Sequence, residues 1–167
     1  YRTSVANRMA TVAKLTRTAE SPVAGEKEPG IVTHPLLIDT ETLQQQLGQS
    51  GVVIIDVRGK AAYEFGGHIP GAVHSTWHEY SDPNAVAKGL LNPDLGQIER
   101  ILQRLGINQD SDVVIYSNPF DNWGDEGRMF WMLEYLGHTR LRILDGGWVK
   151  WTAEKRPFGH GPVSPTR

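Results

Sequence analysis

Residues 117–128 hold the side chains whose types and spacing best suit chemistry. This polar stretch directly follows the apolar run 113–116, and a helical pattern begins where it ends. In an open parallel sheet such a junction lies at the carboxyl end of a strand, where ligand sites form. The stretch offers one hydroxyl nucleophile, three carboxylates and one guanidinium. Its candidate site residues are Ser117, Asn118, Asp121, Trp123, Asp125, Glu126 and Arg128.

Ser117 could act as a nucleophile only with a base beside it, and the local sequence does not supply the usual setting. It is flanked by Tyr116 and Asn118, so the Gly-x-Ser-x-Gly turn of serine hydrolases is missing. The sequence places no acid and histidine beside it. The chain also has no cysteine, which excludes disulfides, zinc–thiolate sites and thiol catalysis, including that of cysteine-dependent phosphatases. We interpret Ser117 as a polar loop residue and predict no catalytic residue.

Metal binding has one candidate pair, His74 and His78, which lie four residues apart. This spacing suits a metal only if both side chains share one helix face. The sequence just before His74 has extended character, and no third ligand is evident. We therefore predict no metal site and no cofactor.

Composition and length are those of one compact globular domain with some additional chain. Of the 167 residues, 39% are hydrophobic and 22% are charged. The net charge of -2 gives no electrostatic reason to expect a nucleic-acid partner. No apolar run is long enough for a transmembrane segment. The compartment stays open between cytoplasmic and exported.

Hydrophobic patterns predict alternating strands and helices. Strands are expected at 52–57, 71–74, 113–116 and 141–144. Helices are expected at 40–47, 61–65, 92–105, 129–136 and 148–153. Asn92 is predicted to cap the third helix, with Pro93 in its first turn. This order indicates an α/β fold with a mainly parallel central sheet flanked by helices on both faces.

The ends divide the chain into three predicted parts. Residues 1–35 form an extension, in which 1–18 carry a basic amphipathic pattern and 20–30 are rich in turn residues. The basic helix suits a membrane surface or a partner, but its short apolar stripe favours packing on its own protein. The folded domain is predicted at 36–158, followed by a linker-like tail at 159–167. Because the chain starts without Met and ends in that tail, we expect a fragment of a longer protein.

Four stretches in the correct order resemble the rhodanese family of sulfurtransferases. They are Asp56-Val57-Arg58 with residues 63–64 and 67–74, the strand 113–116, residues 131–138, and Leu144-Asp145-Gly146-Gly147-Trp148 with Trp151. The resemblance covers residues 36–157 and implies the rhodanese-like fold. It also implies structural rather than catalytic roles for the signature residues Asp56, Arg58, His68, Gly71, Asp145, Gly146, Gly147 and Trp148.

The sequence departs from that family at the position that decides activity. Catalytic rhodaneses carry a cysteine directly after the equivalent strand, and it holds the transferred sulfur as a persulfide. Here the residue is Ser117, whose hydroxyl lacks the low pKa of a thiol and cannot hold a stable persulfide. The loop is also longer, and its acids Asp121, Asp125 and Glu126 would repel thiosulfate.

This longer, cysteine-less loop is similar to that of the amino-terminal domain in tandem thiosulfate or 3-mercaptopyruvate sulfurtransferases. The resemblance therefore implies the supporting half of such an enzyme. Its partner would be a second rhodanese domain, in the same parent chain or in trans. The alternative is a stand-alone, non-catalytic module that binds a protein. Phe120 and Trp123 could contact a partner domain or fold back over the loop, and both interpretations stay open.

Overall fold

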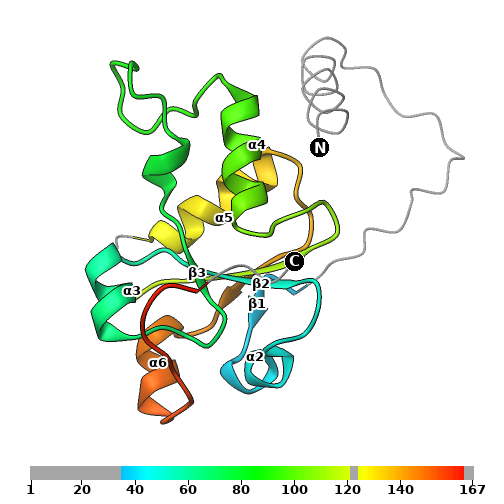
Figure 1. Cartoon of the computed structure of the whole chain (residues 1–167), viewed down its shortest axis with the longest axis vertical. Helices are drawn as coiled ribbons and strands as arrows, with labels where there is room; N and C mark the ends of the chain where they lie inside the picture. Colours follow the sequence, from blue (N-terminus) through cyan, green and yellow to red (C-terminus); the bar gives the residue numbers. More distant parts are fainter. Residues whose placement is uncertain (1–34, 121–123, 164–167) are drawn as a thin grey trace, which may run out of the picture.

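The computed structural model describes residues 35–120 and 124–163 (Figure 1). The predicted helix at 1–18 and the predicted linker at 20–30 lie outside the described residues. So do Asp121 and Trp123 of the candidate loop. Along the described chain, strands and helices alternate.

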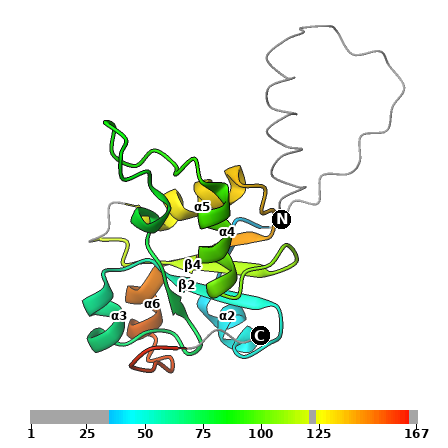
Figure 2. The same ribbon diagram turned by 45° about the horizontal axis from the view of Figure 1, so that its top comes forward.

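A five-stranded parallel sheet forms the centre of the described fold (Figures 1 and 2). Its strands are β1 (Leu37–Ile38), β2 (Val52–Asp56), β3 (Val73–His74), β4 (Asp112–Tyr116) and β5 (Leu141–Leu144). The order across the sheet is β1-β5-β4-β2-β3, which puts β4 in the middle. Val113, Val114 and Ile115 of β4 are fully buried, because elements pack on both sheet faces. Since the strands are parallel, the carboxyl ends of β2, β4 and β5 lie at the same end of the sheet, and the candidate loop begins there.

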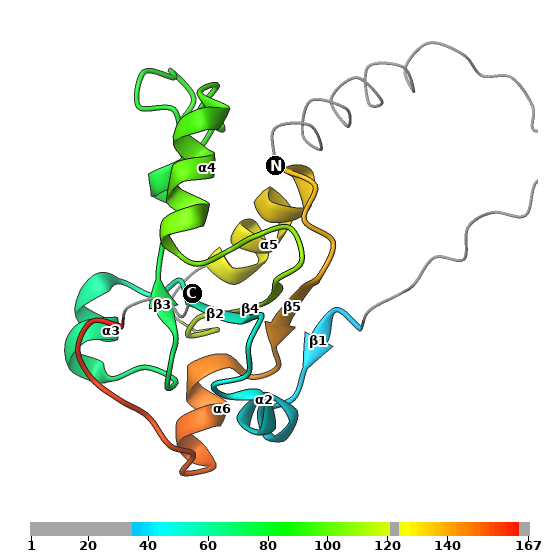
Figure 3. The ribbon, with the colours of Figure 1, turned by 45° about the vertical axis from the view of Figure 1, so that its right-hand side comes forward.

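Helices cover both faces of the sheet, as the sequence predicts (Figures 2 and 3). They are α2 (Thr40–Gln46), α3 (Lys60–Gly66), the 3-10 helix η1 (Trp77–Tyr80), α4 (Leu95–Arg104), α5 (Asp125–Tyr135) and α6 (Gly147–Ala153). The core on the face of α4, α5 and η1 includes Ile55, Ile115 and Leu133. The core on the other face includes Leu43 of α2 and Trp151 of α6. The predicted α/β fold with a parallel sheet is confirmed.

The start of α4 differs from the prediction, because Asn92 is not its cap. The N-cap is Asp94, whose side chain accepts a hydrogen bond from the Gln97 amide at 3.1 Å. Asn92 is buried instead, with Oδ1 accepting from the Asp94 amide at 2.9 Å and Nδ2 donating to Gln97 Oε1 at 3.1 Å. Pro93 precedes the helix. The Asn92 amide donates to the Tyr80 carbonyl oxygen at 2.8 Å, and this tertiary contact holds residue 92 outside the helix.

Other differences are confined to short elements and element ends. β1, which pairs with β5, and η1 are not predicted from the sequence patterns. Each is shorter than the window in which periodicity can be recognised. β2 ends at Asp56 rather than Val57, and α6 begins at Gly147 rather than Trp148.

His138, just after α5, is expected to make stability depend on pH. Its side chain is buried, its Nε2 lies 2.8 Å from the Ser111 carbonyl oxygen, and its Nδ1 has no hydrogen-bond partner among the described residues. Burial lowers the pKa of His138, because desolvation disfavours the imidazolium. The unfolded chain therefore binds a proton at a higher pH than the folded chain does. The free energy of unfolding should fall as the pH drops below about 6.5, the ordinary pKa of histidine.

Urea denaturation at about pH 7.5 and about pH 5 measures this effect. The wild-type chain should lose more stability between the two pH values than a His138→Gln variant, which cannot take up the proton. Equal losses in the two proteins would show that His138 does not carry the pH dependence.

Candidate functional site

Ser117 is the first residue after β4, and α6 fixes its backbone. Its carbonyl oxygen accepts a hydrogen bond from the Trp148 amide at 2.9 Å. The approach is so close that a Cβ on Gly147 would lie 2.3 Å from the same oxygen. The φ of 52° at Gly147 also favours glycine. Ser117 is thus held between the middle strand and α6, with 2% of its surface exposed.

The Ser117 hydroxyl donates a hydrogen bond to the Glu126 carboxylate. Glu126 and Asp125 lie in the first turn of α5, after the N-cap Gly124. Carboxylates are favourable at this end of a helix, because its dipole is positive there. An anion that approached Ser117 would therefore meet a carboxylate. The site therefore contains a hydroxyl bound to a carboxylate, with Ser117 buried and Glu126 half-buried.

Asp125 and Arg128 interact with η1 rather than with Ser117. Asp125 Oδ1 accepts a hydrogen bond from Trp77 Nε1 at 3.0 Å. The Arg128 guanidinium carbon lies 3.8 Å from the centroid of the Trp77 ring. The structure thus brings Ser117 and Glu126 together, while Asp125 and Arg128 point toward a neighbouring element.

The other described residues of the loop differ in exposure. Asn118 is half-buried directly after Ser117, and Phe120 is 82% exposed. The ring of Phe120 therefore does not fold back over the base of the loop. Of the two interpretations given for this side chain, contact with a partner stays open.

Asp56 and Arg58 form a buried ion pair at the end of β2. Asp56 is fully buried, Arg58 is 4% exposed, and Arg58 Nη2 lies 2.6 Å from Asp56 Oδ2. The same nitrogen donates to the Gly67 carbonyl at 2.6 Å, and the Tyr116 hydroxyl donates to Asp56 Oδ2 at 2.6 Å. Burial, reinforced by the Asp56 charge, raises the pKa of Tyr116 well above its usual range, so the phenol stays a donor. These bonds tie the ends of β2 and β4 to the loop at Gly67.

Trp148 of α6 contacts this ion pair through its ring. The guanidinium carbon of Arg58 lies 4.2 Å from the centroid of the Trp148 ring, in cation–π geometry. Arg58 and Trp148 are expected from the sequence, whereas Tyr116 is not predicted as their neighbour. A signal was present, because a phenol that ends an otherwise aliphatic buried strand needs a polar partner.

His68, between α3 and β3, binds the chain that follows α6. His68 Nε2 lies 2.8 Å from the Gly161 carbonyl oxygen, and the imidazole ring stacks on Tyr63 at 4.4 Å between centroids. The backbones of His68 and Gly159 exchange two hydrogen bonds of 2.9 Å. The part of the predicted linker-like tail from Gly159 to Gly161 therefore packs on the domain. Composition could not reveal this, because residues 159 and 161 take part through their backbone groups, which every residue has.

The remaining signature residues shape turns. Asp145 donates its amide to the Ile38 carbonyl at 2.9 Å and accepts from Lys150 Nζ at 2.6 Å, which fixes the turn from β5 into α6. Gly146 has a φ of 74° in that turn, and Gly71 has a φ of 80° before β3. Left-handed backbone of this kind is accessible to glycine at little cost.

His74 and His78 point to different partners. His74 Nε2 lies 2.7 Å from the Arg58 carbonyl oxygen, and His78 stacks on Trp77 at 3.6 Å between centroids. Within residues 35–120 and 124–163, no three His, Cys, Asp or Glu side chains are grouped to hold a metal ion. None of the described helices has the length and apolar character needed to cross a membrane.

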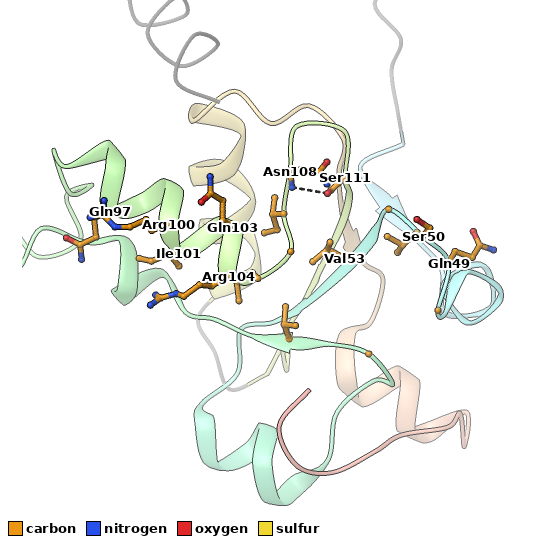
Figure 4. Close-up of a pocket in the computed structure, with 18 residues that line it drawn as sticks. Gln49, Ser50, Val53, Gln97, Arg100, Ile101, Gln103, Arg104, Asn108 and Ser111 are labelled. Carbon is orange, nitrogen blue, oxygen red and sulfur yellow. Dashed lines mark hydrogen bonds between the residues drawn. The ribbon is translucent and has the colours of Figure 1, made fainter. Parts of the chain in front are cut away.

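A cleft of about 1120 Å³ lies near the amino ends of β2 and β4, away from Ser117 (Figure 4). Arg100, Gln103 and Arg104 of α4 line one side of it, and Ser111 lies at the turn before β4. The sequence patterns do not predict it, because loops form much of its wall. Since Ser117 is not among its lining residues, the cleft is separate from the candidate loop.

Comparison with known proteins links these features to one family. The chain matches the rhodanese-like domain over residues 39–154. It is 32% identical over 127 residues to the sulfur carrier protein TtuD of Thermus thermophilus. It is 31% identical over 136 residues to the thiosulfate sulfurtransferase of Azotobacter vinelandii. These alignments cover 75% and 78% of this chain but only 42% and 47% of the two relatives, so the chain spans less than half of their length.

A solved structure gives the same result for the fold. SseA from Escherichia coli, reported for the rhodanese fold of 3-mercaptopyruvate sulfotransferases, superimposes with a TM-score of 0.65 at 26% identity. The match covers 78% of this chain and 52% of SseA. With a family match that spans most of the folded residues and a parallel sheet that superimposes on SseA, the chain belongs to the rhodanese-like domain family.

Proposed function

We propose that this rhodanese-like domain is the non-catalytic, supporting half of a tandem sulfurtransferase of the thiosulfate or 3-mercaptopyruvate type. One observation carries the proposal. The position after β4 holds a buried serine bound to Glu126, in a chain that has no cysteine. Because a persulfide requires a thiolate, the sulfur would be carried by a second rhodanese domain, with this one forming a wall of the active site.

Two further observations support a partner domain. Relatives such as the Azotobacter vinelandii thiosulfate sulfurtransferase are about twice as long as the region that this chain matches, which leaves room for a second domain. Phe120 lies in the candidate loop with 82% of its surface exposed. An exposed aromatic ring of this kind suits a contact with another domain.

The purified chain is expected to form no thiocyanate from thiosulfate and cyanide, since none of its residues can carry the sulfane sulfur. Absorbance of the ferric thiocyanate complex measures the product, and a catalytic rhodanese assayed in parallel serves as the positive control. Turnover by the pure chain above the rate without protein would contradict the proposal.

The supporting role is tested on the natural gene product, read beyond Arg167. We expect that product to form thiocyanate, to lose this activity on alkylation with iodoacetate, and to lose it when residues 36–158 are deleted. A gene product that ends soon after Arg167 and shows no turnover would favour the stand-alone, protein-binding module instead.

A cysteine at position 117 is expected not to restore activity. In Ser117→Cys the thiol would lie against the Glu126 carboxylate, and a negative neighbour disfavours the thiolate. Its reaction with a disulfide reagent such as DTNB should be roughly tenfold slower or more than that of an exposed thiol, because burial adds to the effect of charge. The matched control is Ser50→Cys at an exposed loop position. Equal reaction rates, or thiocyanate formation by Ser117→Cys, would show that residue 117 remains accessible and activated.

A further inference from the structure

A groove with aromatic walls lies between α5 and the chain around η1. It has a volume of about 550 Å³, and its main lining residues are Trp77, Leu90, Arg128, Trp131, Met132 and Tyr135. We call it the aromatic groove. α5 and η1 contact each other on one face of the sheet, so packed core residues lie beneath the groove (Figure 1). Its floor includes Met132, which is 5% exposed.

The rim of the aromatic groove exposes large apolar side chains to water. Trp131 is 62% exposed, Tyr135 is 50% exposed and Leu90 is 57% exposed. The rings of Trp131 and Tyr135 stack at 5.7 Å between centroids, which leaves a flat aromatic surface along α5. Trp131 does not belong to either hydrophobic core. Exposed apolar surface of this kind marks interaction sites, and its concave shape and volume are those of small-molecule sites.

The aromatic groove also has a defined charge. Among its described lining residues, Arg128 alone is charged. Its guanidinium stacks on Trp77 at 3.8 Å, and its Nη2 donates to the Gly89 carbonyl at 2.9 Å. These two contacts hold the planar group in place. A guanidinium has five N–H donors in all, so it can bind an anion while it keeps the bond to Gly89.

We propose that the aromatic groove binds a flat, apolar molecule that carries one anionic group, such as an aryl carboxylate. The rings of Trp131 and Tyr135 would stack on the apolar part, and Arg128 would bind the carboxylate. A cationic ligand would suit the aromatic walls alone, but the charge of Arg128 opposes it. The volume lies in the range of small-molecule sites. This site is independent of the proposed supporting role in sulfur transfer.

A pair of matched probes tests the ligand class. Naphthalene-2-carboxylate and its neutral amide have the same shape and differ in charge. Each is titrated into the full 15N-labelled chain, and the indole N–H signals of the tryptophans are followed by NMR. We expect the carboxylate to shift the Trp131 signal and to bind roughly tenfold more tightly than the amide. Trp148 and Trp151, which pack with the opposite face of the sheet, are internal references and should not shift.

Four variants separate the site from general effects. Arg128→Gln should lower the affinity for the carboxylate to that for the amide, and Trp131→Ala should weaken both probes. Arg104→Gln and Phe65→Ala remove an exposed arginine and an exposed aromatic ring elsewhere and should change neither affinity. Absence of a Trp131 shift, equal affinity for the two probes, or an unchanged affinity in Arg128→Gln would each overturn the proposal.

Discussion

Replacing Asp56 with alanine is expected to destabilise the domain by about 3–5 kcal/mol, the cost of leaving a buried charge without its partner. Arg58 is 4% exposed and cannot reach water without disrupting its contact with Trp148. The Tyr116 hydroxyl would also lose its acceptor. Urea denaturation followed by far-UV circular dichroism gives the free energy of unfolding of both proteins.

Two control variants make this prediction specific. Asp112→Ala removes a carboxylate from the start of β4 that pairs with Arg140 at 2.5 Å, but these side chains are 27% and 43% exposed. That change should cost less than about 1 kcal/mol, as exposed ion pairs do. The double variant Asp56→Leu with Arg58→Met should recover part of the loss, because it removes the uncompensated charge. A cost at Asp56 no larger than that at Asp112 would refute the structural role of the pair.

Gly147→Ala is expected to destabilise the domain by about 2–4 kcal/mol, from the added methyl group and the left-handed backbone together. The new Cβ would lie 2.3 Å from the Ser117 carbonyl oxygen and 3.1 Å from Pro119 Cδ. Relief would require α6 to move away from β4, and the bond from the Trp148 amide to Ser117 would lengthen or break. Thermal and urea denaturation both report the loss.

Gly71→Ala separates the two contributions. Gly71 has a φ of 80°, but a Cβ there would meet no atom within 4 Å. Its replacement should therefore cost only the backbone contribution, about 1–2 kcal/mol. If the two alanine variants lose the same stability, a Cβ at residue 147 does not clash with the Ser117 carbonyl oxygen, and the prediction is wrong.

The fold could be predicted from the sequence wherever a hydrophobic pattern is long enough to be recognised. Val113 to Ile115 form an apolar run that is buried on both faces, and Ile98, Ile101 and Leu102 form a helical stripe that packs on the sheet. The predicted N-cap of α4 was wrong because Asn92, Pro93 and Asp94 all favour a helix start. Only tertiary contacts choose among them. β1 depends on its pairing with β5, which is remote in sequence.

The location of the candidate site could be predicted from the sequence, but the contacts of its side chains could not. Ser117 directly follows β4, so its position at the carboxyl-terminal end of the sheet follows from the parallel topology. The bond from Ser117 to Glu126 depends on where α5 begins, which turn residues alone do not fix. Arg128 points to Trp77 because η1 packs against α5, a contact between segments far apart in the chain.

The contact between Ser117 and α6 has a consequence for how such domains can diverge. The fold depends on residue 117 through its carbonyl oxygen, which every amino acid provides. Under the proposed function, the sulfur chemistry of a catalytic rhodanese would depend on the side chain at this same position. Stability and reactivity are thus carried by different atoms, and an exchange of cysteine for serine can remove the activity while the backbone contact that anchors the loop is preserved.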